Sequence, residues 1–269
     1  MTGPKIITSL TNDRVKAIRA LGMRKTRKET ALFIAEGVSL LISARDRGVV
    51  PQTLVYRSGE AESGFVRGLI TFALKEGAEV LEVSQTVLAK LASKDNPQTV
   101  LGVYRQRFAA PPEPQAIASS STWIALEEVR DPGNLGTIVR TADAAGCAGI
   151  ILVGACCDAY QSEAVRATMG SIFAVPIVKM EPEPFLALAA AWPGDVVAAT
   201  LDARDDFRTT YRGPELVVMG GEGPGLSDAA VAAATRRVKI PMAGDLDSLN
   251  LAIATALILY QVRGARLKL

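Results

Sequence analysis

The stretch from Ile240 to Gly264 is the feature that most constrains the fold of this chain. It begins with a short loop rich in Gly, Asp and Ser, and it continues as an apolar run that only Asn250, Thr255 and Gln261 interrupt. A helix that is apolar on nearly all sides has to be buried. A membrane span would need an unbroken apolar stretch of about 18 or more residues. The stretch therefore predicts a helix of the core or of a subunit interface.

The loop before the apolar run places polar groups at the start of this helix. Ser248 or Asp247 is expected to cap the first turn by accepting a hydrogen bond from a backbone N–H. Asn250 then lies inside the first turn, where unsatisfied amides can also hold a ligand. We therefore expect the helix to begin at a binding site.

The chain contains no histidine. This excludes Ser-His-Asp triads, Cys-His dyads, His-based zinc sites and an imidazole general base. The cysteines, Cys147, Cys156 and Cys157, do not have the spacing of a metal site, and we expect them to be small buried apolar residues. Chemistry then has to come from carboxylates, from Arg or Lys, or from a cofactor that supplies the reactive group.

The length of 269 residues fits one large domain or two ordinary ones. The first residues show no charged segment followed by an apolar one, as an export leader would. We therefore expect the protein in the cytoplasm.

Positive charge is concentrated in the first part of the chain. Residues 1–108 hold 17 Lys and Arg against 10 Asp and Glu, a net +7, and the remaining residues hold 13 against 18, a net −5. A basic module joined to an acidic one is typical of a polyanion-binding arm on a catalytic body, although a merely solvated basic face is the alternative. Clustered Lys and Arg contact phosphates without recognising sequence. The densest such cluster consists of Arg24, Lys25, Arg27 and Lys28.

Strands and helices alternate through residues 1–108, which predicts a small α/β domain. The expected helices lie within 9–29, 38–48, 65–77 and 85–93, and the expected strands at 31–37, 53–57, 78–83 and 99–106.

Residues 109–121 are rich in Pro and in small polar residues, which predicts a linker. Residues 122–269 again alternate, with short loops, and such strand-helix-strand units predict a parallel sheet. The strands are expected at 122–129, 149–154, 174–180, 195–202, 215–221 and 236–242, and the helices near 133–146, 161–169, 184–191 and 226–234.

The first polar turn of this second domain follows its first strand. In an open α/β sheet, ligands bind outside the carboxyl ends of the strands. Pro132 and Gly133 form a turn, and Asn134 lies where the helix would begin. Arg140 follows in a stretch of small and apolar residues. A buried Arg needs an anionic partner, so we expect Arg140 to bind an anion, with an ion pair to Asp143 or another carboxylate as the alternative.

The second polar turn is the glycine-rich loop within residues 217–227. A strand, a glycine cluster and a helix form the pattern by which backbone amides approach a phosphate or a nucleotide, although a plain tight turn is the alternative. The loop lacks both the dinucleotide spacing and the Gly-Lys-Ser/Thr of a phosphate loop. Glu222 would repel a triphosphate and is better suited to accept from a ribose hydroxyl or an amine. Ser248 and Asn250 belong to the third turn.

Three segments resemble, in their order and spacing, the motifs of the SpoU/TrmH-type RNA ribose 2′-O-methyltransferases of the SPOUT superfamily. They are DPGNLGTIVRTADAAG at 131–146, GGEGPGLS at 220–227 and IPMAGDLDSLNLAIATAL at 240–257. Residues 1–108 resemble the small substrate-binding domain of members that act on ribosomal RNA. The resemblance implies a C-terminal α/β SPOUT domain over residues 122–269 with a deep trefoil knot, S-adenosylmethionine bound in the knot, and a homodimer.

The resemblance also implies roles for individual residues. The motif Asn and Arg of the family correspond to Asn134 and Arg140, its second-motif Glu to Glu222, and its third-motif Ser and Asn to Ser248 and Asn250. The cofactor-binding loops correspond to Thr200, Leu201, Gly220, Gly221, Glu222, Gly223, Gly225, Ile240, Met242, Leu249 and Asn250.

The activity that the resemblance implies is methylation of a ribose 2′-hydroxyl in structured RNA, with ribosomal RNA favoured and transfer RNA as the alternative. The cofactor carries an activated methyl group, so the protein has mainly to align the hydroxyl with it. The family implies Arg140 as the proton acceptor, with help from a substrate phosphate. Because a guanidinium has a pKa above about 12, a phosphate clamp is the alternative role for Arg140.

Two other functions stay open on the sequence alone. One is a non-catalytic RNA-binding or ribosome-assembly protein on the same scaffold, which the complete set of motif residues disfavours. The other is an enzyme that uses a nucleotide or dinucleotide at the glycine loop, which the missing fingerprint disfavours.

Overall fold

The computed structural model describes residues 3–92 and 98–267. The chain folds into two compact units, one formed by Met1–Gln106 with Asp158–Ala174 and the other by Arg107–Cys157 with Val175–Leu269. The segment Asp158–Ala174 packs with the first unit although it lies within the stretch expected to form the second domain. The compact units thus do not simply follow chain order, and the domain boundaries drawn from the sequence remain a prediction.

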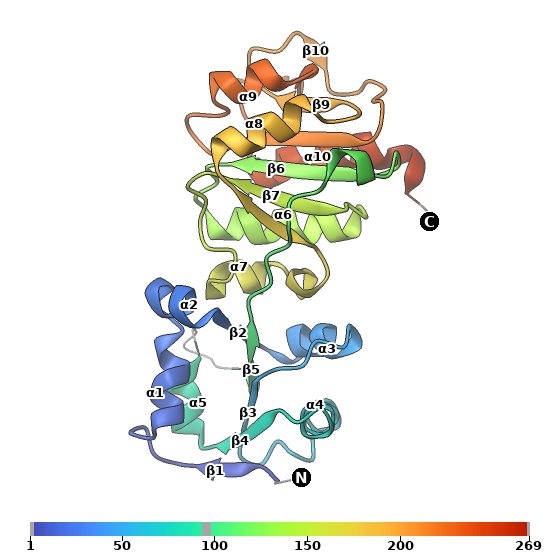
Figure 1. The fold of residues 1–269 in the computed structure, drawn as a ribbon. Helices are drawn as coiled ribbons and strands as arrows, with labels where there is room; N and C mark the ends of the chain where they lie inside the picture. Colours follow the sequence, from blue (N-terminus) through green and yellow to red (C-terminus); the bar gives the residue numbers. More distant parts are fainter. Residues whose placement is uncertain (1–2, 93–97, 268–269) are drawn as a thin grey trace. The chain divides into compact units, whose positions relative to one another are not determined.

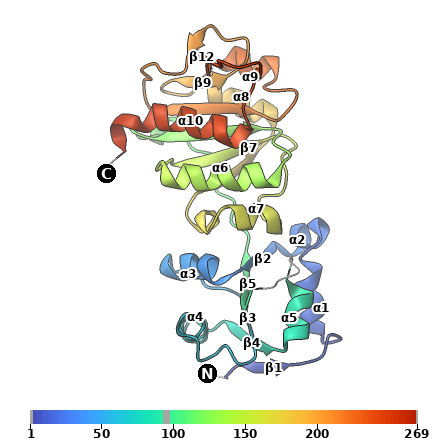
Figure 2. The same cartoon turned by 180° about the vertical axis from the view of Figure 1, so that it is seen from behind.

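The first unit contains a mixed sheet in the order β1-β4-β3-β5-β2. β4 is parallel to β1 and β3, whereas β5 is antiparallel to β3 and β2. Helices α1 and α5 cover one face of the sheet, and α3 and α4 cover the other (Figures 1 and 2). The elements are β1 (Lys5–Ile7), α1 (Asp13–Ala20), α2 (Arg24–Thr30), β2 (Leu32–Glu36), α3 (Val38–Asp46), β3 (Thr53–Arg57), α4 (Gly64–Lys75), β4 (Glu79–Val83), α5 (Gln85–Leu91), β5 (Val100–Arg105), α7 (Ser162–Ala167) and the 3-10 helix η2 (Ser171–Phe173).

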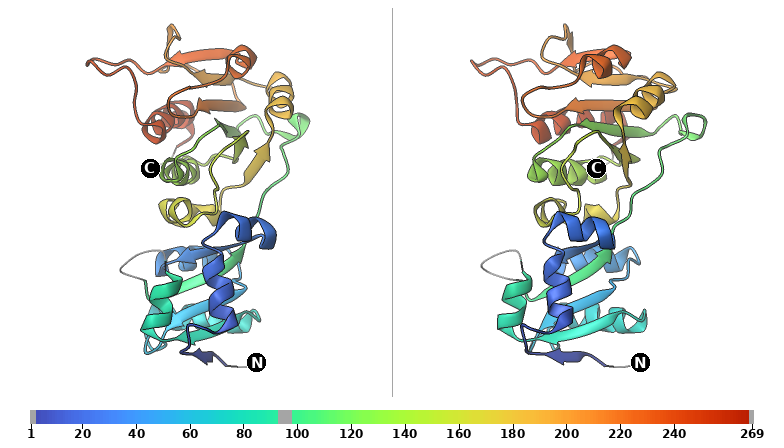
Figure 3. Two further views of the ribbon diagram at one scale, coloured as in Figure 1. Left: turned by 90° about the vertical axis from the view of Figure 1, so that its left-hand side faces the viewer. Right: turned by 60° about the vertical axis from the view of Figure 1, so that its left-hand side comes forward.

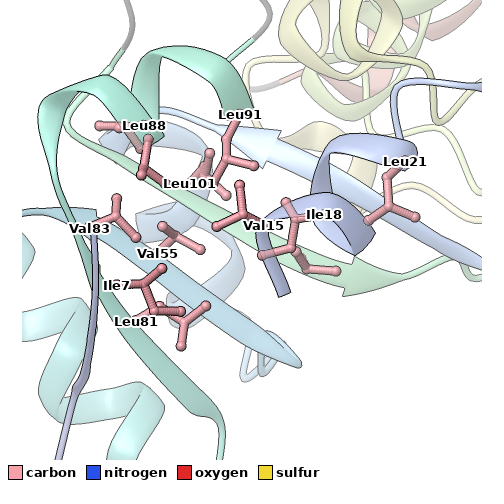
Figure 4. Close-up of a cluster of buried hydrophobic side chains, with 12 residues drawn as sticks. Ile7, Val15, Ile18, Leu21, Val55, Leu81, Val83, Leu88, Leu91 and Leu101 are labelled. Carbon is pink, nitrogen blue, oxygen red and sulfur yellow. The ribbon is translucent and has the colours of Figure 1, made fainter. Parts of the chain in front are cut away.

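The predicted alternation of strands and helices is confirmed in this unit, except that β1 was not predicted. β1 is a three-residue edge strand in which only Ile7 is buried, so it carries no alternating pattern. The core between the sheet and the α1/α5 layer consists of aliphatic side chains, shown in Figure 4. They come from α1, α5 and the inward faces of β3, β4 and β5, because apolar residues recur with the helical period in α1 and on one face of each strand.

An aromatic cluster attaches the segment Asp158–Ala174 to the first unit. The ring of Phe33 in β2 lies 4.7 Å from the ring of Tyr160 and 6.0 Å from that of Phe173. The ring of Tyr104 in β5 lies 4.9 Å from that of Phe173. Such tilted ring pairs contribute beyond the area that they bury. The segment is therefore an integral part of the first core.

The second unit contains a sheet in the order β10-β12-β9-β11-β6-β7-β8, in which every neighbouring pair is parallel. Helices α8 and α9 lie on one face, and α6 and α10 lie side by side on the other (Figures 1 to 3). The predicted parallel sheet is therefore confirmed. The elements are the 3-10 helix η1 (Pro114–Ala116), β6 (Thr122–Glu127), α6 (Pro132–Ala144), β7 (Gly149–Val153), β8 (Ile177–Met180), α8 (Pro182–Ala190), β9 (Val196–Ala199), β10 (Asp205–Asp206), β11 (Glu215–Gly220), α9 (Asp228–Ala233), β12 (Arg236–Lys239), α10 (Leu251–Arg263) and the 3-10 helix η3 (Gly264–Arg266).

The strands at the centre of this sheet are buried on both faces. β7 and most of β6 and β11 consist of buried residues, as expected of parallel strands between two helical layers. The two-residue strand β10 was not predicted, because so short an element has no recognisable pattern. No helix within the described part of the chain is long and apolar enough to span a membrane.

The cysteines differ from the prediction of burial, since all of them are only half-buried. Burial still raises the pKa of the Cys147 thiol to about 12; the charge of Arg263 lowers this pKa and that of Glu215 raises it, both by less. Over residues 3–92 and 98–267, no group of three or more His, Cys, Asp and Glu side chains is arranged to hold a metal ion.

Candidate active site

A cavity of about 650 Å³ opens in the second unit where the strands β9, β11 and β12 end. Its walls are formed by the residues after these strands and by the start of α10. Such a volume lies within the range of roughly 300–1,000 Å³ that is usual for small-molecule sites. Of the residues assigned to cofactor loops from the sequence, those that line the cavity are Thr200, Leu201, Gly220, Gly221, Glu222, Gly223, Gly225, Ile240, Met242 and Leu249.

The glycine loop after β11 folds back on itself. Gly221 and Gly225 form an isolated antiparallel bridge, and the Gly225 amide donates to the Gly221 carbonyl at 3.2 Å. A Cβ on Gly220 would lie 2.1 Å from the carbonyl carbon of Gly225. Gly223 and Gly225 have φ angles of 96° and 72°, which L-residues with side chains rarely adopt. The loop therefore requires glycine for its shape, and its backbone forms one wall of the cavity.

Glu127 fixes the far end of this loop, and sequence reasoning missed it. It ends β6, is only 8% exposed, and accepts from the Ser227 amide at 2.8 Å and from the Ser227 hydroxyl at 2.7 Å. Ser227 in turn caps α9. A carboxylate that ends an otherwise apolar strand was the available signal, because a buried charge needs such partners.

Asn134 joins the three motifs. Asp131 caps α6 and accepts from the Asn134 amide at 2.6 Å, which fixes Asn134 in the first turn. The Asn134 side chain donates to Glu222 of the glycine loop and accepts from Asn250 at 2.9 Å. The structure thus brings together polar residues that lie 88 and 116 positions from Asn134 in the chain.

Asn250 caps α10, which corrects the prediction that Ser248 or Asp247 would do so. Its side-chain oxygen accepts from the amides of Ala252 and Ile253 at 2.9 and 3.3 Å. The helix therefore begins one residue after Asn250 rather than before it. Asn is among the best N-cap residues, and its remaining NH₂ group is free to donate to Asn134. Ser248 is exposed and lines the cavity.

Arg140 differs from the prediction of a buried residue. It lies on the exposed face of α6, and within the described chain its guanidinium has no ion pair or side-chain hydrogen bond. The expected alternative, an ion pair with Asp143, is not formed. The reason is the helical register, since Ile138 and Val139 face the core and Arg140 falls on the outer face. Its charge is therefore available to a ligand.

The cavity is acidic and contains an unsatisfied hydroxyl. The Thr200 hydroxyl oxygen is buried without a hydrogen-bond partner among the described residues. A buried hydroxyl without a partner is costly, which favours a ligand that bonds to it. Lys239 is the basic residue of the described lining, and the carboxylates there are Asp202, Glu222, Asp228 and Asp247. The cavity therefore suits a ligand with a net positive charge.

The basic cluster predicted to contact RNA contains both exposed and buried side chains in the structure. Arg24 and Lys28 are exposed on α2, and Lys25 is exposed and lies 3.9 Å from the Glu29 carboxylate. Arg27 is only 4% exposed, so its assignment to an RNA-binding surface is wrong. Its guanidinium donates to Asp158 at 2.8 and 2.9 Å and to the Leu21 and Gly22 carbonyls at 2.9 Å each.

Known families match both parts of the chain. Residues 121–260 match the family described as SpoU rRNA Methylase family, and residues 12–102 match the MRM3-like substrate binding domain. The first range contains Asn134, Arg140, Glu222, Ser248 and Asn250.

Individual proteins are similar over nearly the whole chain. The crystal structure of an AdoMet-bound rRNA methyltransferase from Sinorhizobium meliloti is 44% identical, covers 98% of this chain and 99% of its own, and superposes with a TM-score of 0.88. The 23S rRNA (guanosine(2553)-2′-O)-methyltransferase RlmP of Bacillus subtilis is 28% identical over 97% of this chain and 100% of its own length. The 23S rRNA (uridine(2479)-2′-O)-methyltransferase of Streptomyces viridochromogenes is 30% identical over 90% of this chain and 85% of its own.

Proposed function

Because this chain belongs to the SpoU rRNA methylase family, we propose that it transfers the methyl group of S-adenosylmethionine to a ribose 2′-hydroxyl of ribosomal RNA. The observation that carries the proposal is the hydrogen-bonded set of Asn250, Asn134 and Glu222 beside the cavity. These residues come from three separate motifs, and they meet where a small-molecule donor and a substrate group could be held together.

The cavity fits S-adenosylmethionine. At neutral pH this cofactor carries a sulfonium and an ammonium against one carboxylate, so its net charge suits the acidic lining. The unsatisfied Thr200 hydroxyl and the open backbone of Gly220–Gly225 offer groups that can bond to it. When bound, the cofactor supplies a methyl group activated on sulfur. Leu201, Ile240, Met242 and Leu249 would contact its apolar parts.

The chain's own polar residues would position the ribose. Asn134 is held by Glu222 and Asn250, so its side-chain orientation is set before substrate arrives. Preorganised groups of this kind raise the rate because little reordering remains at the moment of reaction. Ser248, exposed at the cavity rim, would bond to the substrate or to the cofactor.

Arg140 would clamp an RNA phosphate next to the reacting ribose. It is exposed, and within the described chain it has no acidic partner, so a phosphate can accept two parallel N–H bonds from its guanidinium. The chain has no histidine to accept the hydroxyl proton. The clamped phosphate or water then accepts this proton, since a guanidinium remains protonated in proteins.

The RNA would be held by the first unit. Its family match is to a substrate binding domain, and Arg24, Lys25 and Lys28 are exposed on α2. The two curated relatives modify a guanosine and a uridine of 23S rRNA. We therefore infer the class of RNA and leave the nucleotide to experiment. A ribosomal RNA substrate favours the cytoplasm as the location.

We also propose a homodimer, which the exposed face of α10 supports. Ile253, Leu257 and Tyr260 are 52%, 41% and 48% exposed and lie on one side of the helix. They form an apolar surface that a second copy would bury. Light scattering is expected to give the mass of a dimer, and Leu257→Glu is expected to give a monomer.

A deep trefoil knot in the second unit is part of the same proposal. β11 lies between β6 and β9 in the sheet, although both of these strands precede it in the chain. The chain then continues to β12, which lies on the other side of β9. The segments that line the cavity follow these strands, as expected if the cofactor binds in the knot. Single-molecule stretching from both ends is expected to give an unfolded length shorter than the full contour, and the full contour would contradict the knot.

The activity is tested by incubating the protein with radiolabelled S-adenosylmethionine and separated, unmodified ribosomal and transfer RNAs. Label is expected in ribosomal RNA, at a linkage that resists alkali because its 2′-hydroxyl is methylated. Label on a base, label only in transfer RNA, or no label would each contradict the proposal. Calorimetry with the cofactor alone separates an inactive RNA-binding protein from an enzyme assayed with the wrong RNA.

A further inference from the structure

The first unit contains a second cavity, of about 170 Å³, formed by α1, β2, α5 and α7. All its lining residues belong to this unit, since α7 lies within Asp158–Ala174. Its walls include apolar side chains and three basic residues from three different helices. The basic residues are Arg19, Lys90 and Arg166.

Two of the three basic residues at this cavity have no acidic partner. Arg19 and Lys90 are exposed, and within the described chain neither has an ion pair. The Arg166 guanidinium is half-buried and donates to the Ser162 hydroxyl at 2.8 Å, which fixes its direction. Glu36 contributes one carboxylate to the lining, so the cavity keeps a net positive charge.

Several other basic side chains of the first unit form ion pairs with acidic partners. The pairs are Lys5 and Arg14 with Glu79, Lys16 with Asp13, Lys25 with Glu29, Arg27 with Asp158, Arg45 with Asp46, Arg57 with Glu60, and Arg67 with Glu62. Arg24, Lys28 and Lys75 also lack an ion pair within the described chain, so what distinguishes Arg19 and Lys90 is that both line one cavity.

We infer that this cavity binds one phosphate of the RNA substrate, together with the sugar or base attached to it. The inference rests on the proposed function and places part of the RNA-binding site at this cavity of the first unit. Arg19 and Lys90 at the mouth would contact the phosphate from two sides, and Arg166 would donate from within.

The apolar walls indicate what accompanies the phosphate. Leu21 and Leu91 of the core in Figure 4 also line this cavity, together with Ile34 and Tyr160. Apolar walls accept the face of an unstacked base or the carbon atoms of a ribose. The cavity is too small for a duplex, so the nucleotide comes from a single-stranded loop, bulge or end.

The test is equilibrium binding of the full chain, without cofactor, to an unmodified in vitro transcript of 23S rRNA at several KCl concentrations. Lys90→Ala is compared with Lys75→Ala, which removes an exposed lysine at the end of α4 on the opposite face of the sheet. Neither lysine has an ion pair within the described chain. The pair is thus matched in residue type and in charge.

Lys90→Ala is expected to weaken binding by about 2- to 5-fold and the double variant Arg19→Ala/Lys90→Ala by about 5- to 30-fold, with a salt dependence shallower by about one phosphate contact per substitution. Lys75→Ala is expected to match wild type. Arg19→Lys should retain most of the affinity. A short single-stranded RNA should compete for the site and a duplex of equal length should not.

Equal affinities of the Lys75→Ala and Lys90→Ala variants would overturn the inference, as would better competition by the duplex. Unfolding temperatures of all variants are measured first, so that a misfolded variant is not mistaken for a binding defect. Methyl transfer by the wild type to the same transcript is assayed separately. If the wild type methylates the transcript but substitution of Arg19 and Lys90 leaves RNA binding unchanged, this inference alone is wrong. If substitution of Arg19 and Lys90 weakens RNA binding but the wild type does not methylate the transcript, the proposed function is wrong.

Discussion

Helices α2 and α6 each carry an arginine, and the two side chains lie in opposite environments. Arg27 of α2 is 4% exposed, and its guanidinium is bonded to Asp158 and to the Leu21 and Gly22 carbonyls. Arg140 of α6 is exposed, and its guanidinium has no partner within the described chain. Arg27 has a structural role, because its guanidinium joins α2 to the start of the segment Asp158–Ala174. Arg140 is left for a ligand.

The comparison shows that the role of an arginine depends on whether its N–H groups donate to other groups of the protein or remain available to a ligand. A buried guanidinium is tolerated only when its charge and donors are satisfied, and such a group has nothing left for substrate. An exposed guanidinium without a partner costs the fold little and retains its capacity for a phosphate. The two positions should therefore respond to substitution in opposite ways.

The largest effect is expected from Arg140→Ala. Methyl transfer should fall by about a thousandfold, because the phosphate that positions the ribose is no longer held, while cofactor affinity and stability stay near wild type. Single-turnover rates and calorimetry measure the two effects. The matched control is Arg237→Ala, an exposed arginine of β12 that has no ion pair within the described chain and does not line the cavity. Parallel loss of cofactor binding and activity would mean that Arg140 has a structural role.

Arg27→Ala should instead lower the stability of the first unit. Removing one partner of a buried ion pair leaves Asp158 charged and uncompensated, at a cost of about 3–5 kcal/mol. Lys28→Ala, the exposed neighbour on the same helix, should change the free energy of unfolding by less than about 0.5 kcal/mol. Denaturant unfolding of both variants provides the measurement. Equal free energies of unfolding for the Arg27→Ala and Lys28→Ala variants would contradict the structural role of Arg27.

Asn134→Ala tests whether a polar residue of α6 that belongs to the site differs in effect from one that does not. It removes the link between Glu222 and Asn250, and methyl transfer should fall by about a hundredfold because the site is no longer preorganised. Thr137→Ala, one turn further on, loses only a hydroxyl that donates to Gly133 of the same helix. Its rate should stay within about twofold of wild type, since nothing at the site changes. Equal rates in the two variants would contradict the role of Asn134.

Asn250→Asp has the smallest expected effect and separates two roles of one side chain. Aspartate keeps the oxygen that caps α10 and is favoured at a helix N-terminus, so stability should be retained. It loses the amide donor to Asn134, and methyl transfer should fall by about tenfold. Asn250→Ala should lose about 1 kcal/mol of stability as well, because the cap is gone. An Asn250→Asp variant with wild-type rates would show that the Asn250–Asn134 bond is dispensable.

Much of the fold could be predicted from the sequence, because its signals are local. Buried parallel strands such as β7 and amphipathic helices such as α1 have patterns that extend over several residues. The positions that line the cavity were also foreseeable, since the motifs fix which residues follow β9, β11 and β12. The proposed roles of these residues remain to be tested.

The errors in the sequence analysis arose where the outcome depended on distant residues or on exact helical register. The burial of Arg27 depends on Asp158, which lies 131 positions away, and nothing near Arg27 indicates that partner. Arg140 lies beside buried residues in sequence but faces outward, because one position on a helix turns the side chain by about 100°. The cap of α10 depended on a single residue, and the boundaries of elements are the least certain feature of any sequence pattern.

The central claim is that separate turns of the second unit form one site for the methyl donor. Hydrogen–deuterium exchange of the full chain, with and without S-adenosylmethionine, tests it directly. The account predicts slower exchange in residues 199–202, 219–226 and 239–251 together, at the cofactor concentration that saturates binding. Slower exchange in only one of these segments, or in none of them, would contradict it.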